Sequence, residues 1–309
     1  RLRPFILGGI VVFVLAEILL FSPSSVDSWG SNSSPSEVDP DDLAASFESD
    51  IKLMGLDSNK IPEYSVTDFD YTSTQKGKKQ WKLKASRGFL YHKDRLVLGR
   101  SARAELYEGV DDKITLITGD FARYAMTRKD LEIYGKVVTR FPDGFIVHSE
   151  YVHYDPTTKR IDIPTRYTAH GEGLVEPSRQ LQFTSQGLHF QMGDNLITLP
   201  SEVQFIIEPS SKANPNRTET THIESDQCTI DRTEHKVHFH MKAGRSSEEA
   251  FVHLRQPTLT IKSRTMSMNY GDSATPGTSH FDSILAEQDV SLAAKAHKPE
   301  TPSGTAGKP

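Results

Sequence analysis

Three histidines lie within six residues near the end of the chain, where imidazole nitrogens could bind a metal ion. The stretch HKVHFHMK contains His235, His238 and His240, and His253 follows. In a β-strand His238 and His240 would share one face, so a zinc or copper site is geometrically possible. The intervening Phe239 points to the other face, however, and no acidic ligand follows at a suggestive spacing. We therefore expect solvated strand histidines and no bound metal or cofactor, and keep a metal site as the alternative.

Other chemistry has little support in the residues. Cys228 is the single cysteine, so an intramolecular disulfide or a thiolate cluster is impossible. A lone cysteine most often serves as a small apolar residue. No G-x-S-x-G, H-E-x-x-H or Walker pattern occurs, which argues against an enzyme. The net charge is −5, and no basic stripe with interleaved aromatics appears, which argues against nucleic acid as a partner.

The N-terminal segment has the composition of a membrane span. Residues 4–21, PFILGGIVVFVLAEILLF, carry only one charge, that of Glu17. As a helix they would be about 27 Å long, enough for a bilayer core. Arg1 and Arg3 precede the segment and the next basic residue is Lys52, so the positive-inside rule puts the N-terminus in the cytoplasm and the bulk of the chain across the membrane. We predict a single-pass anchor at residues 1–22.

Two alternatives concern this segment. A cleavable signal peptide would also begin with an apolar run, but no A-x-A site occurs in the following FSPSSVDSWG. Glu17 most simply reaches the interface, and the other possibility is a buried contact with a second membrane subunit.

Polar tails flank the remaining chain. Residues 23–60 are predicted to be a flexible linker, rich in Ser, Pro, Asn and acidic residues. Within it Leu43, Phe47, Ile51 and Met54 have the spacing of a short amphipathic helix. Residues 293–309 are low in complexity and are predicted to be a disordered tail.

Between the tails, residues 61–292 alternate apolar and polar side chains in short runs broken by Gly, Asp, Asn and Pro. No helical pattern of twelve or more residues competes there, so the sequence predicts an all-β, antiparallel structure with one sheltered face. The alternating residues that we assign to that face are Trp81, Leu83, Ala85, Leu96, Leu98, Ile114, Leu116, Leu131, Ile133, Val137, Leu259 and Ile261.

A thirteen-residue pattern recurs within the strand-rich region. It reads GDFARYAMTRKDL at residues 119–131, SEYVHYDPTTKRI at 149–161 and SDQCTIDRTEHKV at 225–237, with weaker copies at 84–96 and 185–197. The aromatic and aliphatic positions recur while the polar ones vary. One unit cannot shelter its apolar face alone, so we expect stacked units with a continuous apolar interior.

At this point the chain resembles the LptC family, the membrane-anchored component of the lipopolysaccharide transport bridge. The resemblance rests on the order of short N-terminal stub, single span and β-domain, and on residues 118–155, TGDFARYAMTRKDLEIYGKVVTRFPDGFIVHSEYVHYD. It assigns residues 61–200 to an LptC-like β-jellyroll. Residues 201–292 exceed a minimal member and resemble additional LptA-like rungs.

The resemblance implies an inner-membrane protein whose bulk is periplasmic. Its jellyroll would receive lipopolysaccharide acyl chains from an ABC-type extractor in the inner membrane and pass them to the next jellyroll of the bridge. The strand YSVTDFDY at residues 64–71 would face the permease subunits of the extractor, and FDSILAEQDVSL at 281–292 the bridge protein. The candidate groove residues are Phe69, Tyr71, Trp81, Leu83, Leu106, Leu116, Phe121, Ile133, Val137, Phe145 and Val147.

Two other functions fit parts of the pattern. An anchored periplasmic scaffold would assemble partners through its sheet edges without carrying lipid, and would have a closed, dry core where a carrier exposes an apolar cleft. A surface adhesin or β-solenoid fibre would favour a more regular period than this chain has.

Overall fold

The computed structural model describes residues 62–108, 113–174, 179–209, 220–242, 251–272 and 279–294. The chain divides into two compact units, residues 1–58 and 59–309, and the described residues all belong to the second. No helix in these ranges is long and apolar enough to cross a membrane. The predicted anchor and linker lie outside the described residues, and so does the predicted tail beyond residue 294.

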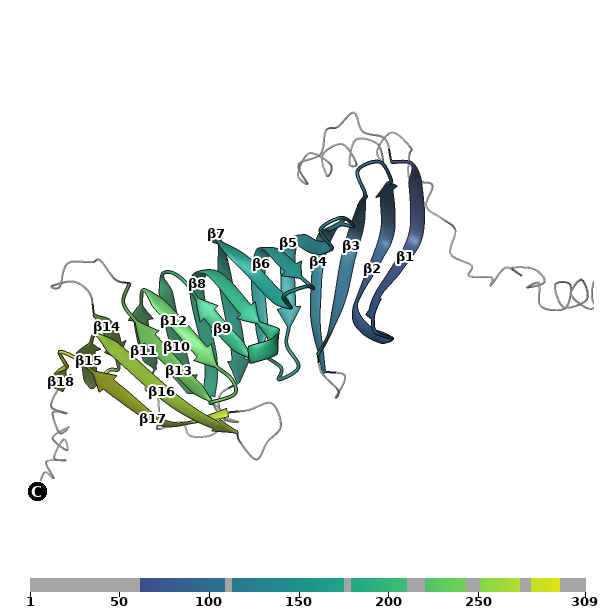
Figure 1. Ribbon diagram of the computed structural model, residues 1–309. Helices are drawn as coiled ribbons and strands as arrows, with labels where there is room; N and C mark the ends of the chain where they lie inside the picture. Colours follow the sequence, from purple (N-terminus) through teal and green to yellow (C-terminus); the bar gives the residue numbers. More distant parts are fainter. Residues whose placement is uncertain are drawn as a thin grey trace, which may run out of the picture. The chain divides into compact units, whose positions relative to one another are not determined.

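The described chain forms antiparallel strands that belong to one continuous sheet, with a single turn of 3-10 helix, η1 (Met192–Asp194) (Figure 1). The all-β prediction is confirmed for these residues. The strands are β1 (Tyr64–Gln75), β2 (Lys78–Tyr91), β3 (Leu96–Glu108), β4 (Lys113–Ala125), β5 (Asp130–Arg140), β6 (Ile146–Asp155), β7 (Arg160–Leu174), β8 (Arg179–Gln191), β9 (Leu196–Leu199), β10 (Val203–Pro209), β11 (Thr221–Ser225), β12 (Gln227–Asp231), β13 (Lys236–His240), β14 (Val252–Arg255), β15 (Leu259–Ser263), β16 (Thr265–Asp272), β17 (Ser279–Glu287) and β18 (Ser291–Ala294).

The pairing between neighbouring strands is interrupted near the middle of each long strand. Between β3 and β4, for example, Arg100 pairs with Phe121 and Ala102 with Gly119, and the residues between them are unpaired. After β8 the interruption becomes a break, because β8 pairs with β9 through its last residues and with β10 through its first. The ladder therefore runs without a gap across residue 200, where we expected the additional rungs to begin.

These interruptions divide the sheet into two halves. Half I contains β9, β12, β13, β16, β17 and the hairpin turns at residues 92–95, 126–129, 156–159, 192–195 and 232–235. Half II contains β10, β11, β14, β15, β18 and the turns at 76–77 and 141–145. The chain passes from one half to the other at each interruption, so every long strand contributes to both.

The sequence repeat encodes one interruption followed by one turn of half I. Its eleventh residue has a positive φ in the copies that hold Lys129, Lys159, Asn195 and His235, at 61°, 54°, 52° and 54°. This left-handed conformation is unusual for residues with a side chain. Asp155 stabilises one such turn, because its Oδ1 accepts a hydrogen bond of 2.8 Å from the Thr157 amide. The polar positions of the repeat thus serve turn geometry.

Serines at the start of the repeat hold the interruptions. Ser149 donates its hydroxyl to the carbonyl of Tyr151, and Ser185 to that of Gly187. Ser225 and Ser263 repeat the bond to the carbonyl two residues further on, at 3.0 and 2.8 Å. Each hydroxyl replaces a ladder hydrogen bond that the carbonyl loses where pairing stops. Ser263 makes this bond at the interruption between β15 and β16, outside the copies of the repeat.

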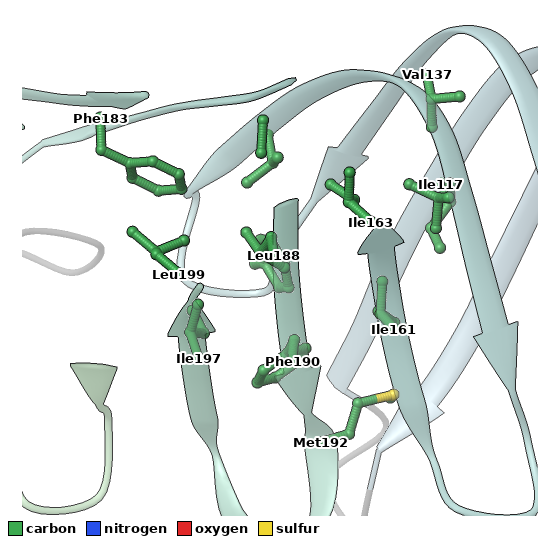
Figure 2. Packing of buried hydrophobic residues seen from close by; sticks show 14 of the residues in the cluster. Ile117, Val137, Ile161, Ile163, Phe183, Leu188, Phe190, Met192, Ile197 and Leu199 are labelled. Atoms are coloured by element: carbon green, nitrogen blue, oxygen red, sulfur yellow. The ribbon is translucent and has the colours of Figure 1, made fainter. Parts of the chain in front are cut away.

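Buried side chains from both halves form one hydrophobic cluster that extends from Trp81 in β2 to Met268 in β16. Figure 2 shows part of it, where Ile161 of β7, Leu188 of β8 and Ile197 of β9 lie on neighbouring strands. The predicted continuous apolar interior is therefore present in the described chain.

Candidate functional site

The interior holds most of the predicted groove residues. Trp81, Leu83, Leu106, Ile133, Val137 and Val147 are buried members of the cluster. Phe69, Tyr71 and Phe145 are partly buried and pack against it. Whether any of these side chains contacts a lipid remains a prediction.

Two predicted residues, Leu116 and Phe121, are not members of the cluster, and their assignment to the interior is corrected. In β4 the buried side chains before the interruption are Thr115 and Ile117. The register shifts between Thr118 and Phe121, after which Ala122 and Tyr124 are buried. The alternation in KITLITG was therefore assigned to the wrong face, because threonine occupies an interior position there while Ile114 is 40% exposed.

The end of the interior nearest β1 is lined by three aromatic rings. Trp81 lies edge-on to Tyr124, with ring centroids 4.9 Å apart, and Tyr71 lies 5.3 Å from each. The hydroxyls of Tyr71 and Tyr124 are 3.5 Å apart. Burial, together with this hydrogen bond, raises the pKa of Tyr124 above its ordinary value, so the ring stays neutral. The two tyrosine hydroxyls thus form a polar contact among otherwise apolar side chains.

A second row of aromatic rings continues through the later rungs. Phe145 stacks on Phe183 and Phe183 on Phe205, with centroids 5.6 Å apart in both pairs. Phe205 then meets Phe239 edge-to-face at 5.0 Å, which connects half II to half I. Phe183, Phe205 and Phe239 were not among the predicted groove residues. Alternation in QLQFT, VQFII and KVHFH was the signal that could have identified them.

The opposite face of half I carries a ladder of polar side chains. Glu132 pairs across the strands with His153, His153 with Asp162, and Asp162 with His189. Asp162 Oδ1 lies 2.5 Å from His189 Nδ1, and Asp162 Oδ2 accepts a hydrogen bond of 2.6 Å from Arg160 Nε. Burial would raise the pKa of Asp162, but these hydrogen bonds outweigh it and hold the pKa below its usual range.

Burial and hydrogen bonds also act in opposite directions on the pKa of Glu132. Arg123 Nη1 and the Tyr134 hydroxyl each donate to it at 2.7 Å, and the Tyr151 hydroxyl donates at 3.2 Å. Burial would raise the pKa of Glu132, yet the bonds from Arg123 and Tyr134 outweigh it and lower the pKa. Both carboxylates are thus occupied by neighbouring donors on the same face, which is the arrangement of a structural network.

The histidines of this segment lie on β13 and in the turn that precedes it. His238 and His240 share the face opposite the buried Val237 and Phe239, as expected for a strand. His238 Nδ1 lies 3.0 Å from the Ser267 hydroxyl. Among the residues that the structure describes, no group of three or more His, Cys, Asp or Glu side chains is placed to hold a metal ion.

The described sheet ends in unpaired edges that carry exposed apolar side chains. Within the described residues β1 pairs with β2 alone, β17 with β16 alone and β18 with β15 alone. Tyr64 of β1 is 63% exposed, and Leu285 of β17 and Leu292 of β18 are 54% and 63% exposed. Such edges are templates for pairing with another sheet.

Comparison with known proteins places most of this body in one family. A family model described as lipopolysaccharide-assembly, LptC-related matches residues 56–208. No curated protein matches the chain. One similar solved structure is that of LptH from Pseudomonas aeruginosa, the LptA-homologous periplasmic component of the lipopolysaccharide transport device. The two sequences are 11% identical, and the alignment covers 57% of this chain and 92% of that one with a TM-score of 0.25. The assignment therefore rests on the family match, which includes β1 to β9 and most of β10: the chain belongs to the LptC-related family of lipopolysaccharide-assembly proteins.

Proposed function

We propose that this chain carries lipopolysaccharide through the periplasm, with the acyl chains held between the two halves of its sheet. The observation that supports this most directly is the hydrophobic cluster that continues from β2 to β16. Membership of the LptC-related family supplies the class of lipid. The chain takes no chemical step in this function and acts as a conduit.

The energetics favour acyl chains over water in such an interior. Burial of one methylene contributes about 0.8 kcal/mol, so several fatty chains together would be held tightly. The side chains that would contact them are packed against each other, and Leu83, Leu106 and Ile133 are each no more than 1% exposed. Lipid entry therefore requires the two halves to separate, and movement along the sheet requires a push from an energy-consuming extractor.

The edges suggest the direction of transfer. In this proposal β1, with exposed Tyr64 and Val66, pairs with the periplasmic domains of an inner-membrane ABC transporter. The edges of β17 and β18, with exposed Leu285 and Leu292, pair with the next jellyroll of the bridge. The apolar segment at residues 4–21 anchors the chain in the inner membrane, with its N-terminus in the cytoplasm and its bulk in the periplasm.

The test is photo-crosslinking in cells that make the full chain. A photoreactive amino acid is placed at Leu106 or Ile133 in the interior, with Lys129 on an exposed turn as control. Leu116 provides a second control, because it is on a β-strand but outside the interior cluster. Carriage predicts lipopolysaccharide adducts at the two interior positions and none at the controls.

A membrane-anchored scaffold is the second candidate, and the closed packing of the interior favours it. Residues such as Leu98, Ala104 and Phe190 are completely buried, as in an ordinary dry core. A folded chain that gives no adduct at any interior position, while its edge strands still crosslink to partner proteins, would establish the scaffold and overturn carriage.

A further inference from the structure

In the part of the chain that the structure describes, main chain connects the two halves of the sheet at the interruptions. The side on which the hairpin turns lie is therefore closed by side chains. One ion pair joins turns of opposite halves there. Arg232, in the turn between β12 and β13 of half I, lies 2.6 Å from Asp143, in the turn between β5 and β6 of half II. The two residues are 89 positions apart in the chain.

Aromatic side chains lie directly beneath this pair. Phe141 of half II meets Phe190 of half I edge-to-face, with ring centroids 5.2 Å apart. The Arg232 guanidinium lies 5.9 Å from the Phe141 ring centroid and 5.7 Å from that of Phe190. Both rings belong to the buried cluster. Arg232 therefore covers the point at which the interiors of the two halves meet the turn side.

A half-buried carboxylate lies close enough to Arg232 for the two charges to interact. Glu108, at the end of β3, accepts a hydrogen bond of 2.9 Å from the Thr115 hydroxyl. Burial raises the pKa of Glu108, while Arg232 acts in the opposite direction. Arg232 is thus attracted by Asp143 through direct contact and by Glu108 at longer range, and both carboxylates belong to half II.

This pair is suited to open and close. Its side chains are 21% and 45% exposed, for Arg232 and Asp143 respectively, and a pair so accessible to solvent contributes little to stability. The strands that flank each turn are instead held by main-chain pairing, of residues 137–140 with 146–149 in half II and of residues 227–231 with 236–240 in half I. Parting the pair would therefore separate the turns without disrupting either half.

A lipid with a charged head group could pass between the two halves only if the turn side of the sheet were open. Its acyl chains gain from the apolar interior, whereas its charged head group has to stay in water. A lipid that moves from β1 toward β17 can therefore travel only if the turn side is open along its route. The contact between Asp143 and Arg232 lies across that route.

We propose that Asp143 and Arg232 form a latch on the turn side of the sheet, which must open for a lipid with a polar head group to pass. The inference rests on the proposed function. The latch closes the interior when no lipid is present, and the Phe141–Phe190 contact beneath it parts in the same movement.

The first measurement detects opening of the pair without scoring lipid adducts. Cys228 is the only cysteine, is fully buried and precedes Arg232 by four residues in the same hairpin. In membranes from cells that make the full chain, Asp143→Asn and Arg232→Gln should increase the rate at which a small maleimide labels Cys228 several-fold. The double reversal Asp143→Arg with Arg232→Asp should restore the original rate. Urea midpoints of the variants distinguish local opening from global destabilisation.

A matched control is the pair between Glu224 and Arg255, at 3.3 Å and with exposures of 44% and 54%. It lies within half II and does not cross the turn side. Glu224→Gln should leave the labelling rate of Cys228 unchanged. Equal labelling in Asp143→Asn, Arg232→Gln and the unmodified chain would overturn the latch, whether or not the chain carries lipid.

The second measurement asks whether the latch controls passage. Asp143→Cys and Arg232→Cys are combined with Cys228→Ala, and the two new thiols are linked by a short bis-maleimide. Photoreactive residues at Leu83, before the latch, and at Met266, beyond it, report on lipopolysaccharide. Linking should abolish adducts at Met266 and preserve those at Leu83. Adducts at Met266 in the linked chain would overturn the latch, whereas their absence at both positions even in the unlinked chain would overturn the proposed function.

Discussion

Asp162 and His189 lie opposite each other on β7 and β8, with Asp162 Oδ1 2.5 Å from His189 Nδ1. Their contact is the centre of the polar ladder on the outer face of half I. It shows that this face, although polar, is organised by specific partners and is not simply a solvated surface.

The Asp162 contact should make stability depend on pH. The pKa of Asp162 is lowered in the folded chain, so its contribution is complete above the unfolded pKa of about 3.9 and is lost as the pH falls through the folded value. Asp162→Asn should reduce the free energy of unfolding by about 1–3 kcal/mol at pH 7. The difference between variant and original should shrink below about pH 4. Urea unfolding at several pH values measures it, with Glu150→Gln on an exposed position as control. An effect independent of pH would contradict the role of the carboxylate.

The assignment of faces in β4 can be checked by paired truncations. Ile117 is completely buried, so Ile117→Ala should cost about 2–5 kcal/mol of unfolding free energy. Leu116 precedes it, is half-buried and lies outside the cluster, so Leu116→Ala should cost about 1 kcal/mol or less. Denaturant unfolding of both variants gives the comparison. Equal losses would mean that β4 presents both faces to a packed environment.

The serines at the interruptions should matter more than their size suggests. Ser185 is completely buried and donates a hydrogen bond of 2.6 Å to the Gly187 carbonyl. Ser185→Ala leaves that carbonyl without the bond and should cost about 1–3 kcal/mol. Ser86→Ala removes an exposed hydroxyl that donates to the Arg100 carbonyl, and it should cost less because water replaces the bond. Thermal or urea unfolding measures the loss of stability in the two variants. Similar losses would count against the proposed role of the buried serine hydroxyl at the interruption.

Cys228 should be chemically silent in the folded chain. It is buried on β12, and burial raises the pKa of its thiol well above the ordinary value, so little thiolate is present. A disulfide reagent such as DTNB should react slowly with the native chain and rapidly and stoichiometrically in strong urea. Rapid reaction without denaturant would show that the interior is open in the absence of lipid.

The sequence by itself determined the strand content, the repeat and much of the interior. These follow from local rules: alternation identifies a sheltered face, as at Trp81 and Leu83, and polar turn residues mark the hairpins. The resemblance to the LptC family came from the same repeated pattern and agrees with the family match. Local patterns were sufficient to identify the buried face of a strand where apolar and polar side chains alternate along it.

Only the tertiary structure decided the rest. The interior face of β4 was missed because Thr115 occupies an apolar environment, which the alternation of apolar and polar residues does not reveal. The contact between Asp143 and Arg232 joins residues 89 positions apart, through turns of opposite halves. Such a pairing depends on how far the sheet twists between the two turns, which is the sum of small rotations over many strands and cannot be read from any one of them.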